Sequence, residues 1–336
     1  MGMSGSFSLN NEFILDYICQ RFRLGNSRQV KGSIGGSYNV NIKLQTNQGE
    51  FVVRVLNSSS TTAHLRSLQK VLTAARKAGL PVVLPLVSTE GEPYIHCKGR
   101  LLQVTRFVEM GLFENKKGQV TASGRMLRHF HDALQAVTVE PKPKWSFNKD
   151  RAYFLNALSL LEEVPDIPEY QLEKIRLISE RILELFESAE EGLERSIVHG
   201  DWHFWNQGYA DDEVVCVLDF DFVEQGYRIH DVAYALWVIY MLLPAQSRSF
   251  DRDFLKGYGS LTEEEATILP VAVAKVALFF LCYSAYSANP KEKWRKQYRK
   301  QLPLIRWLLE DGGQRLRGLT SEGQEFVEDN DEEDVG

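Results

Sequence analysis

The stretch 199–221 constrains the fold of this 336-residue chain more than any other part of its sequence. It begins with His-Gly-Asp, which ends at Asp201, and it places Asn206 five residues later. A continuous apolar run, 214–218, follows and ends directly before Asp219. Such a run predicts a buried strand, which would hold the polar residues at its end rigidly. The stretch therefore predicts a loop and a short hairpin that bring an amide and several carboxylates together.

These residue types suit phosphoryl transfer. A transferring phosphoryl group carries negative charge on its oxygens, so a catalyst must hold Mg²⁺ against the phosphates and aim an attacking hydroxyl. We expect Asp201 to orient that hydroxyl or to accept its proton. Asn206 and Asp219 would supply the oxygen ligands that a hard cation prefers, with Asp221 as a second carboxylate ligand. The alternative is an Asx-rich hairpin whose carboxylates only cap turns.

The same motif resembles that of a known family. The His-Gly-Asp of 199–201, the Asn five residues after the Asp, and the apolar strand ending in Asp-Phe-Asp at 219–221 are similar to the aminoglycoside phosphotransferase and choline kinase superfamily. The resemblance is to its small-molecule kinase branch. It implies an α+β, two-lobed protein-kinase-like fold, with a small antiparallel-sheet N-lobe and a mainly helical C-lobe. It also implies a phosphotransferase with an alcohol group as acceptor, using ATP and Mg²⁺.

The resemblance divides the chain into three parts. Residues 1–108 would form the N-terminal nucleotide-binding lobe, and residues 109–318 the hinge and the helical catalytic and substrate lobe. The segment 319–336 carries eight acidic residues and no Lys or Arg, so it is predicted to be a disordered, solvated tail. Removing those eight charges changes the net charge from -6 to +2. Overall charge therefore argues neither for nucleic acid nor for a cationic substrate.

A glycine-rich stretch precedes a strand-like alternation that starts at Val40. Gly35, Gly36 and Ser37 lie in it, and glycines without Cβ let backbone N–H groups close over phosphates. Alone the signal is weak, because glycines are common in hairpin turns. Upstream of the Asp201 motif, the stretch is the nucleotide-covering loop that the resemblance implies.

The predicted strand 51–56 carries Arg54 where the family has a lysine that reaches the α- and β-phosphates. Arginine stays charged and binds phosphate oxygens with two N–H groups, so the role is compatible with the change. The alternative is a solvated cation on an edge strand. The helix predicted at 61–78 contains no Asp or Glu, although the family normally places there the glutamate that pairs with the strand cation. No residue is assigned to that role.

The last strand of the first lobe is predicted at 101–108, with a hinge at 109–111. By resemblance, adenine would hydrogen-bond to backbone groups around Phe107 and Glu109.

Three residues are expected to support the catalytic loop. The resemblance gives His199 a structural role at the start of the loop, and Asp231 resembles the family's buried aspartate that steadies the loop from below. Arg228 could supply the cation that a buried carboxylate needs. A helix N-cap role for Asp231 is equally compatible. His199 and His203 are four residues apart, but the intervening glycine argues against a helix, so zinc is not expected.

The leading hypothesis is transfer of the γ-phosphoryl group to a hydroxyl of a small metabolite that is homoserine-, choline- or amino-alcohol-like. Aromatic rings attract quaternary ammonium groups, and several follow the motif: Trp202, Trp205, Tyr234, Trp237 and Tyr240. Trp237 and Tyr240 equally suit the core of an apolar helix.

Three other functions stay open. An aminoglycoside acceptor would need carboxylates in the second lobe, and the candidates are Glu224, Glu263, Glu264 and Glu265. A Glu cluster at a helix start is, however, explained by the helix dipole. A protein Ser/Thr kinase is the second alternative. The third is a catalytically silent kinase-like binding protein, suggested by Arg54 and the missing glutamate.

The four cysteines show neither metal-ligand nor disulfide spacing, which indicates reduced thiols. Residues 1–11 lack the apolar core of a signal peptide. The most apolar stretch, 270–283, contains Lys275 and is shorter than a bilayer crossing requires, so a buried helix is expected. We therefore expect a cytoplasmic protein with a small-molecule hydroxyl substrate, and no nucleic-acid or membrane partner. The sequence leaves the oligomeric state open.

Overall fold

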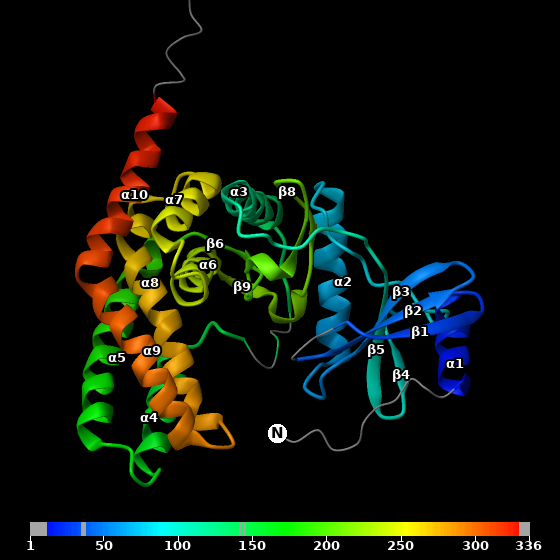
Figure 1. Cartoon of the computed structure of the whole chain (residues 1–336), viewed down its shortest axis with the longest axis horizontal. Coiled ribbons are helices and arrows are strands. Elements are labelled where there is room, and N and C mark those ends of the chain that lie inside the picture. The colour runs from blue at the N-terminus through cyan, green and yellow to red at the C-terminus, as the bar shows by residue number, and fades with distance from the viewer. Residues whose placement is uncertain (1–11, 35–37, 141–142, 144–145, 329–336) are drawn as a thin grey trace, which may run out of the picture.

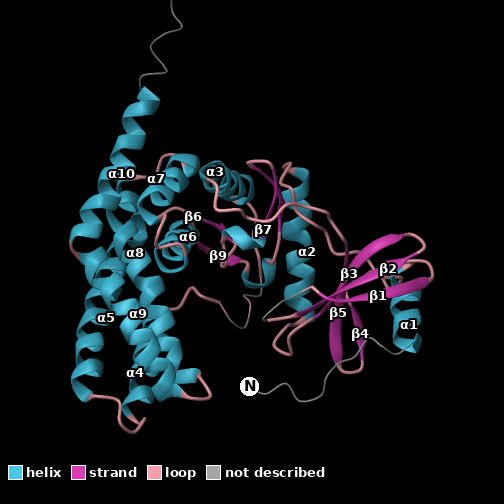
Figure 2. Cartoon of the chain, in the orientation of Figure 1, coloured by secondary structure: helices cyan, strands magenta, loops and turns pink. Residues whose placement is uncertain are grey.

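Two lobes lie side by side along the long axis of the molecule (Figure 1). The computed structural model describes residues 12–34, 38–140, 143 and 146–328. A five-stranded antiparallel sheet fills one lobe, and helices dominate the other (Figure 2). This is the two-lobed α+β architecture that the sequence predicts.

The sheet of the N-lobe has the strand order β1-β2-β3-β5-β4, and each neighbouring pair is antiparallel. The strands are β1 (Ser27–Ser33), β2 (Val40–Thr46), β3 (Gly49–Val55), β4 (Ile95–Cys97) and β5 (Arg100–Arg106). Alternate residues of β3 are buried and pack with the apolar face of α1 (Glu12–Phe22). The other face of β3 carries Arg54 toward the second lobe. The segment 83–94, between α2 and β4, is largely irregular.

Helix α2 (Thr62–Lys77) follows β3 and lies between the lobes (Figure 1). Thr61 caps its start by accepting a hydrogen bond from the N–H of His64, and Gly79 has a φ of +87° just after its end. The apolar face of α2 belongs to the large core of the second lobe rather than to the sheet core. The helix therefore packs with the C-lobe, although it precedes the hinge in sequence.

The C-lobe combines helices with two short ribbons, β6 paired with β9 and β7 paired with β8. Its strands are β6 (Arg195–Val198), β7 (Gln207–Ala210), β8 (Glu213–Val217) and β9 (Glu224–Tyr227). Its helices are α3 (Lys117–Leu134), α4 (Arg151–Glu162), α5 (Glu169–Ala189), α6 (Ile229–Leu242), α7 (Ser247–Tyr258), α8 (Glu263–Cys282), α9 (Pro290–Leu309) and α10 (Asp311–Glu328). The predicted hairpin is β7–β8, but Val215 of β8 is exposed, so this strand is not buried along its whole length.

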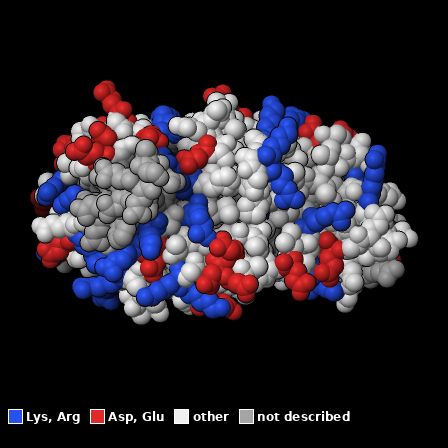
Figure 3. Space-filling model, turned by 90° about the horizontal axis from the view of Figure 1, so that it is seen from above, with Lys and Arg blue, Asp and Glu red and all other residues white. Residues whose placement is uncertain are grey.

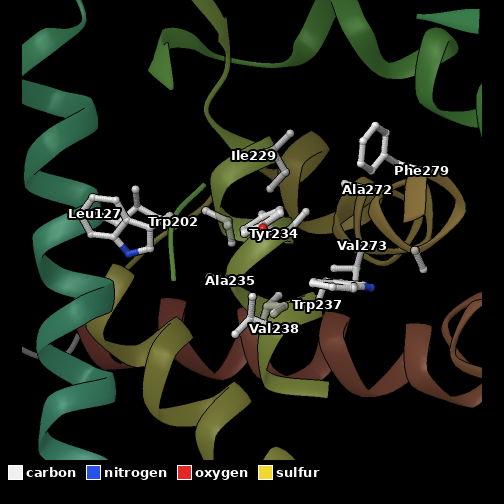
Figure 4. Packing of buried hydrophobic residues seen from close by; sticks show 14 of the residues in the cluster. Leu127, Trp202, Ile229, Tyr234, Ala235, Trp237, Val238, Ala272, Val273 and Phe279 are labelled. Atoms are coloured by element: carbon white, nitrogen blue, oxygen red, sulfur yellow. The ribbon is translucent and has the colours of Figure 1, made fainter. Parts of the chain in front are cut away.

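Helix α8 begins at a capping box between Thr262 and Glu265, seven residues before the apolar stretch that predicts it. By length and composition, Glu263–Tyr286 could cross a membrane, but 67% of its most apolar window is buried in the molecule. It packs against α5, α6, α9 and α10. Figure 4 shows Val273 of this helix beside Trp237 of α6. We therefore assign α8 to the protein core.

The prediction of a disordered acidic tail at 319–336 is wrong for residues 319–328, because α10 continues to Glu328. Leu316 is fully buried and Leu319 packs against the core, so apolar contacts hold this helix where composition alone suggests disorder. Residues 329–336 lie outside the described part of the chain. Acidic and basic side chains are interspersed on the face shown in Figure 3, in keeping with a nearly neutral body.

Candidate active site

The loop that carries Asp201 connects β6 to a 3₁₀ turn at Phe204–Asn206. The carboxylate of Asp231, on α6, accepts hydrogen bonds from the backbone N–H groups of His199 (2.6 Å) and Gly200 (2.8 Å). It also contacts the His131 ring nitrogen at 3.1 Å. Asp231 is fully buried, so these donors replace the water that it loses on folding. The start of the loop is thereby fixed to α6.

Arg228 does not supply the cation for Asp231. Its guanidinium pairs with Glu265 at 2.7 Å and with Glu194 at 2.6 Å, and so ties β6 to the start of α8. Backbone N–H groups and His131 already satisfy Asp231, which removes the need for a cation. Asp231 is also not the N-cap of α6, since that place belongs to Arg228.

Asp201 is held by its neighbours in the loop. The side-chain nitrogen of Asn206 donates to the Asp201 carbonyl at 3.0 Å and to its carboxylate at 3.3 Å. His203 lies 3.7 Å from the same carboxylate, and burial lowers its pKa although the Asp201 charge opposes this. Tyr234 of α6 is hydrogen-bonded to Asp201; burial and the Asp201 charge raise the pKa of its phenol well above the usual value. A carboxylate fixed in this way, beside neutral donors, can orient a hydroxyl or take its proton.

One residue, Leu218, separates Asp219 from the end of β8, and hydrogen bonds hold the Leu218 backbone on two sides. The N–H of Leu218 donates to the Asn206 carbonyl at 2.9 Å, and the Leu218 carbonyl lies 2.9 Å from the His199 ring nitrogen. Asp219 itself has left-handed backbone angles, with φ 63° and ψ 60°. Its side chain is 39% exposed. The strand end therefore presents Asp219 next to the loop of Asp201, as a carboxylate open to solvent.

Arg54 joins the two lobes at this point. Its guanidinium pairs with Asp221 at 2.7 Å and with Asp219 at 3.2 Å. Asn39 donates a further hydrogen bond to the same Asp221 oxygen. The Asp221 side chain is only 7% exposed, and burial raises its pKa to about 7 although the Arg54 charge lowers it. Arg54 therefore has no glutamate partner in α2 and pairs instead with the two aspartates of the Asp-Phe-Asp motif.

The structure describes only some of the other residues that are expected to contact the nucleotide. Gly35, Gly36 and Ser37 lie outside the described residues. The N–H of Phe107 already donates to the Glu50 carbonyl at 3.0 Å, which extends the β3–β5 pairing. A base would therefore have to bond to the Phe107 carbonyl or to the backbone near Glu109. After the hinge, Gly111 pairs with Tyr209 at 2.8 and 3.0 Å and so fixes the linker to β7.

The three expected metal ligands differ in their surroundings. Both hydrogen bonds of the Asn206 amide use its nitrogen, which leaves its oxygen as an acceptor. Asp219 is open to solvent, whereas the Asp221 oxygen already accepts from two donors. Among the described residues, no group of three or more His, Cys, Asp and Glu side chains is arranged to hold a metal ion. Asn206 and Asp219 fit a divalent cation that takes its remaining ligands from phosphates and water, as Mg²⁺ usually does.

The aromatic residues after the motif divide into core and site. Trp202, Trp237 and Tyr240 are buried or partly buried and bond to Ser123, Gln301 and Asp251, so they are structural. Tyr234 instead faces Asp201 and packs with Phe147, with ring centroids 5.0 Å apart.

Phe147 also lies 5.3 Å from Phe222, the residue after Asp221. Phe147, Phe222 and Tyr234 therefore form an apolar wall next to the catalytic carboxylate, which we call the aromatic wall. Sequence reasoning missed Phe147 and Asn39, because each reaches the motif from a distant segment.

Comparisons with known proteins agree with this geometry. A model of the family described as "Phosphotransferase enzyme family" matches residues 30–269, which is more than half of the chain. No curated protein matches the sequence.

Solved structures show the fold. An amicoumacin kinase in complex with AMP-PNP, Ca²⁺ and Ami is 15% identical, with a TM-score of 0.67 over 87% of this chain and 93% of that chain. A microcompartment-associated aminopropanol kinase is 15% identical, with a TM-score of 0.66 over 90% and 99% of the two chains. A choline kinase from Streptococcus pneumoniae is also 15% identical, with a TM-score of 0.59 over 88% and 98%. These similarities confirm the predicted two-lobed, kinase-like fold.

Proposed function

The chain belongs to the phosphotransferase enzyme family and is a kinase for hydroxyl acceptors, and from this premise we propose that it transfers the γ-phosphoryl group of ATP to a hydroxyl of a small amine-bearing metabolite. Amino alcohols, choline and homoserine-like amino acids are the candidate acceptors. Relatives of the same fold include a kinase named for aminopropanol and a kinase named for choline.

One observation carries the proposal: the backbone of Leu218 is hydrogen-bonded to both Asn206 and His199. These two bonds fix the strand end that bears Asp219 against the loop that bears Asp201. A group that orients a hydroxyl and a group that binds a cation thus share one rigid frame, and phosphoryl transfer depends on such positioning.

Each residue has a separate task in this proposal. Asp201 receives the acceptor hydroxyl and holds it in line with the phosphate, while Asn206 fixes the Asp201 rotamer. Asn206 and Asp219 would hold Mg²⁺, which supplies charge neutralisation at the phosphates when bound. Arg54 holds Asp219 from the N-lobe side. Asp221 anchors Arg54, and for that reason we assign it this role rather than that of a second metal ligand.

The surroundings of Asp201 support an acceptor with an apolar or singly cationic amine. Tyr234 of the aromatic wall is hydrogen-bonded to Asp201, and aromatic rings attract alkylammonium groups. Of the carboxylates that an aminoglycoside would need, Glu265 is fully buried on Arg228, and Glu224 is buried in β9. Glu263 and Glu264 are exposed in the first turn of α8. The carboxylates therefore favour a small amine over a polycationic antibiotic.

The same geometry bears on the silent alternative. A binding protein without activity would not need Asp201 held by Asn206 beside an open Asp219. The Arg54 substitution, which suggests that alternative, is compensated by Asp219 and Asp221.

A panel of hydroxyl metabolites tests the proposal directly. Wild-type protein is incubated with ATP and Mg²⁺ and with amino alcohols, choline, homoserine, sugars and aminoglycosides, and the phosphorylated products are identified by mass spectrometry. The matched control is Asp201→Asn, which keeps the shape of the side chain. We expect an amine-bearing alcohol to be phosphorylated by the wild type and not by the variant. Transfer only to an aminoglycoside, only to protein, or to no acceptor at all would overturn the proposed acceptor class.

A further inference from the structure

A second cavity lies in the C-lobe, outside the site of Asp201. Its volume is about 560 Å³, and six of the residues that line it are Lys149, Tyr153, Glu190, Gln225, His230 and Lys275. This volume is typical of sites for small molecules. None of Asp201, Asn206 and Asp219 lines it. We call it the Lys275 cavity.

Lys275 is the residue that needs an explanation. It lies in the middle of the apolar helix α8 and is only 9% exposed. Within the described residues, its ammonium group has neither a hydrogen bond nor an ion pair; its close contact is the ring of Phe186, 4.1 Å from the nitrogen. A buried charge without a partner is costly. Burial accordingly lowers the pKa of Lys275 to about 8.

The neighbouring carboxylates do not form an ion pair that would offset the cost of burying the Lys275 charge. Glu187 is paired with Arg151 at 2.6 Å, and Asp150 caps α4 by accepting from the N–H of Tyr153 at 3.0 Å. Glu190 also lines the cavity, but it lies beyond ion-pair distance from Lys275. The cation therefore faces the cavity without a close counterion from the described chain.

A second polar group lacks a partner in the same cavity. The hydroxyl of Tyr153 is buried and has no hydrogen-bond partner among the described residues. His230 lines the cavity as well, and burial together with the Lys275 charge keeps its pKa well below the usual value. An ammonium group and a hydroxyl are both donors that suit an anion.

We propose that the Lys275 cavity binds the phosphate or carboxylate group of a small metabolite, with the Lys275 ammonium and the Tyr153 hydroxyl as direct ligands. An anion would supply the counterion that the chain lacks here and would receive both donors. The inference does not depend on the acceptor of the kinase reaction.

The cavity and the aromatic wall share one short segment of the chain. Lys149 and Asp150 line the cavity, while Phe147, two residues before Lys149, belongs to the aromatic wall. A bound anion would therefore contact the same short segment that contributes Phe147 to the wall beside Asp201.

Isothermal titration calorimetry tests the inference with two probes, inorganic phosphate and succinate. The protein is first saturated with AMP-PNP and Mg²⁺, so that phosphate does not enter the nucleotide site. The variants are Lys275→Met, which keeps side-chain length without charge, and Tyr153→Phe, which removes only the hydroxyl. The matched control is Lys174→Met, which removes an exposed lysine from α5. Asp201→Asn separates this site from the acceptor site, because nucleotide binding does not use Asp201 and anion binding in the cavity should persist in that variant even if the proposed function fails.

We expect saturable binding of at least one probe at a single site. Loss of one charge-assisted hydrogen bond in Lys275→Met should weaken binding about tenfold or more, and Tyr153→Phe should weaken it by a smaller factor. Lys174→Met should bind like the wild type. Binding of only one probe assigns the ligand to phosphates or to carboxylates.

Two results would overturn the inference. One is the absence of saturable binding of both probes, whatever the melting temperature of Lys275→Met. The other is unchanged binding in Lys275→Met. If Lys275→Met does not fold, Tyr153→Phe decides alone.

Discussion

The ion pair of Arg54 with Asp221 predicts a large and specific loss of stability when the arginine is removed. Arg54→Met leaves the Asp221 carboxylate, whose side chain is 7% exposed, without its cation. Removing one partner of a buried pair typically costs about 3–5 kcal/mol. Asp219 adds little, because it is 39% exposed. We therefore expect Arg54→Met to lower the free energy of unfolding by about 3 kcal/mol.

A double-mutant cycle isolates this pair. In the double variant Arg54→Met/Asp221→Asn no buried charge remains, while Asn39 can still donate to the new amide. The double variant should therefore be more stable than Arg54→Met alone, with a coupling of about 2 kcal/mol measured by urea unfolding without nucleotide. Arg66→Met is the control, because the Arg66–Glu92 pair is exposed and should contribute at most about 1 kcal/mol.

The loss should also depend on pH. The pKa of Asp221 is raised to about 7, so near pH 5.5 the carboxyl is neutral and needs no cation. Arg54→Met should then be less harmful than at pH 8.5. Equal losses at both pH values, or additive effects of the two substitutions, would refute the reasoning.

Three further predictions concern the C-lobe. A Cβ on Gly124 of α3 would lie 2.2 Å from the Phe254 carbonyl, so Gly124→Ala should destabilise by about 2 kcal/mol or more in urea unfolding, whereas Gly318→Ala, with open space around it, should not. Burial lowers the pKa of Lys275 from 10.5 to about 8, and between these pH values the unfolded chain binds one more proton. Wild-type stability should therefore rise relative to Lys275→Met by about 3 kcal/mol from pH 8 to 10.5, and parallel pH profiles would contradict this. Asp231→Asn removes the charge that accepts from His199 and Gly200, so thermal unfolding should show a loss of about 2–4 kcal/mol; a loss no larger than that of the exposed Asp132→Asn would contradict the role of Asp231.

The sequence predicts best what is local. Helix α2 lies within one residue of its predicted bounds at each end, because its apolar positions and its caps are local features of the sequence. The residues of the candidate site from His199 to Asp231 lie in one short stretch, so their spacing in the sequence is enough to identify them as candidates. The strand and loop between them then place Asp219 beside the Asp201 loop.

Contacts between distant segments could not be predicted in this way. Arg54 meets Asp219 and Asp221 across 165 and 167 residues, and nothing in the local pattern of β3 indicates those partners. Arg228 pairs with Glu265, 37 residues later, instead of the nearby Asp231, because backbone donors already satisfy Asp231. In each case tertiary packing decides which charges pair. The residues next to each charge in the sequence do not indicate that partner.

The acidic tail shows the limit of composition as a signal. The absence of Lys and Arg and the many carboxylates predict disorder after Arg317, yet α10 extends to Glu328. Leu316 and Leu319 contact the core at the start of this extension, and an average over the segment conceals them.

The central claim is that Asp219 holds a cation against the nucleotide while Asp201 serves the acceptor. Calorimetric titration of ATP, with and without Mg²⁺, into Asp219→Asn and Asp201→Asn tests it most directly. The account predicts that Asp201→Asn binds Mg-ATP like the wild type, although its turnover falls by about 10²- to 10⁴-fold, and that Asp219→Asn loses the Mg²⁺-dependent part of the affinity. Mg-ATP affinity that is unchanged in Asp219→Asn would contradict the claim.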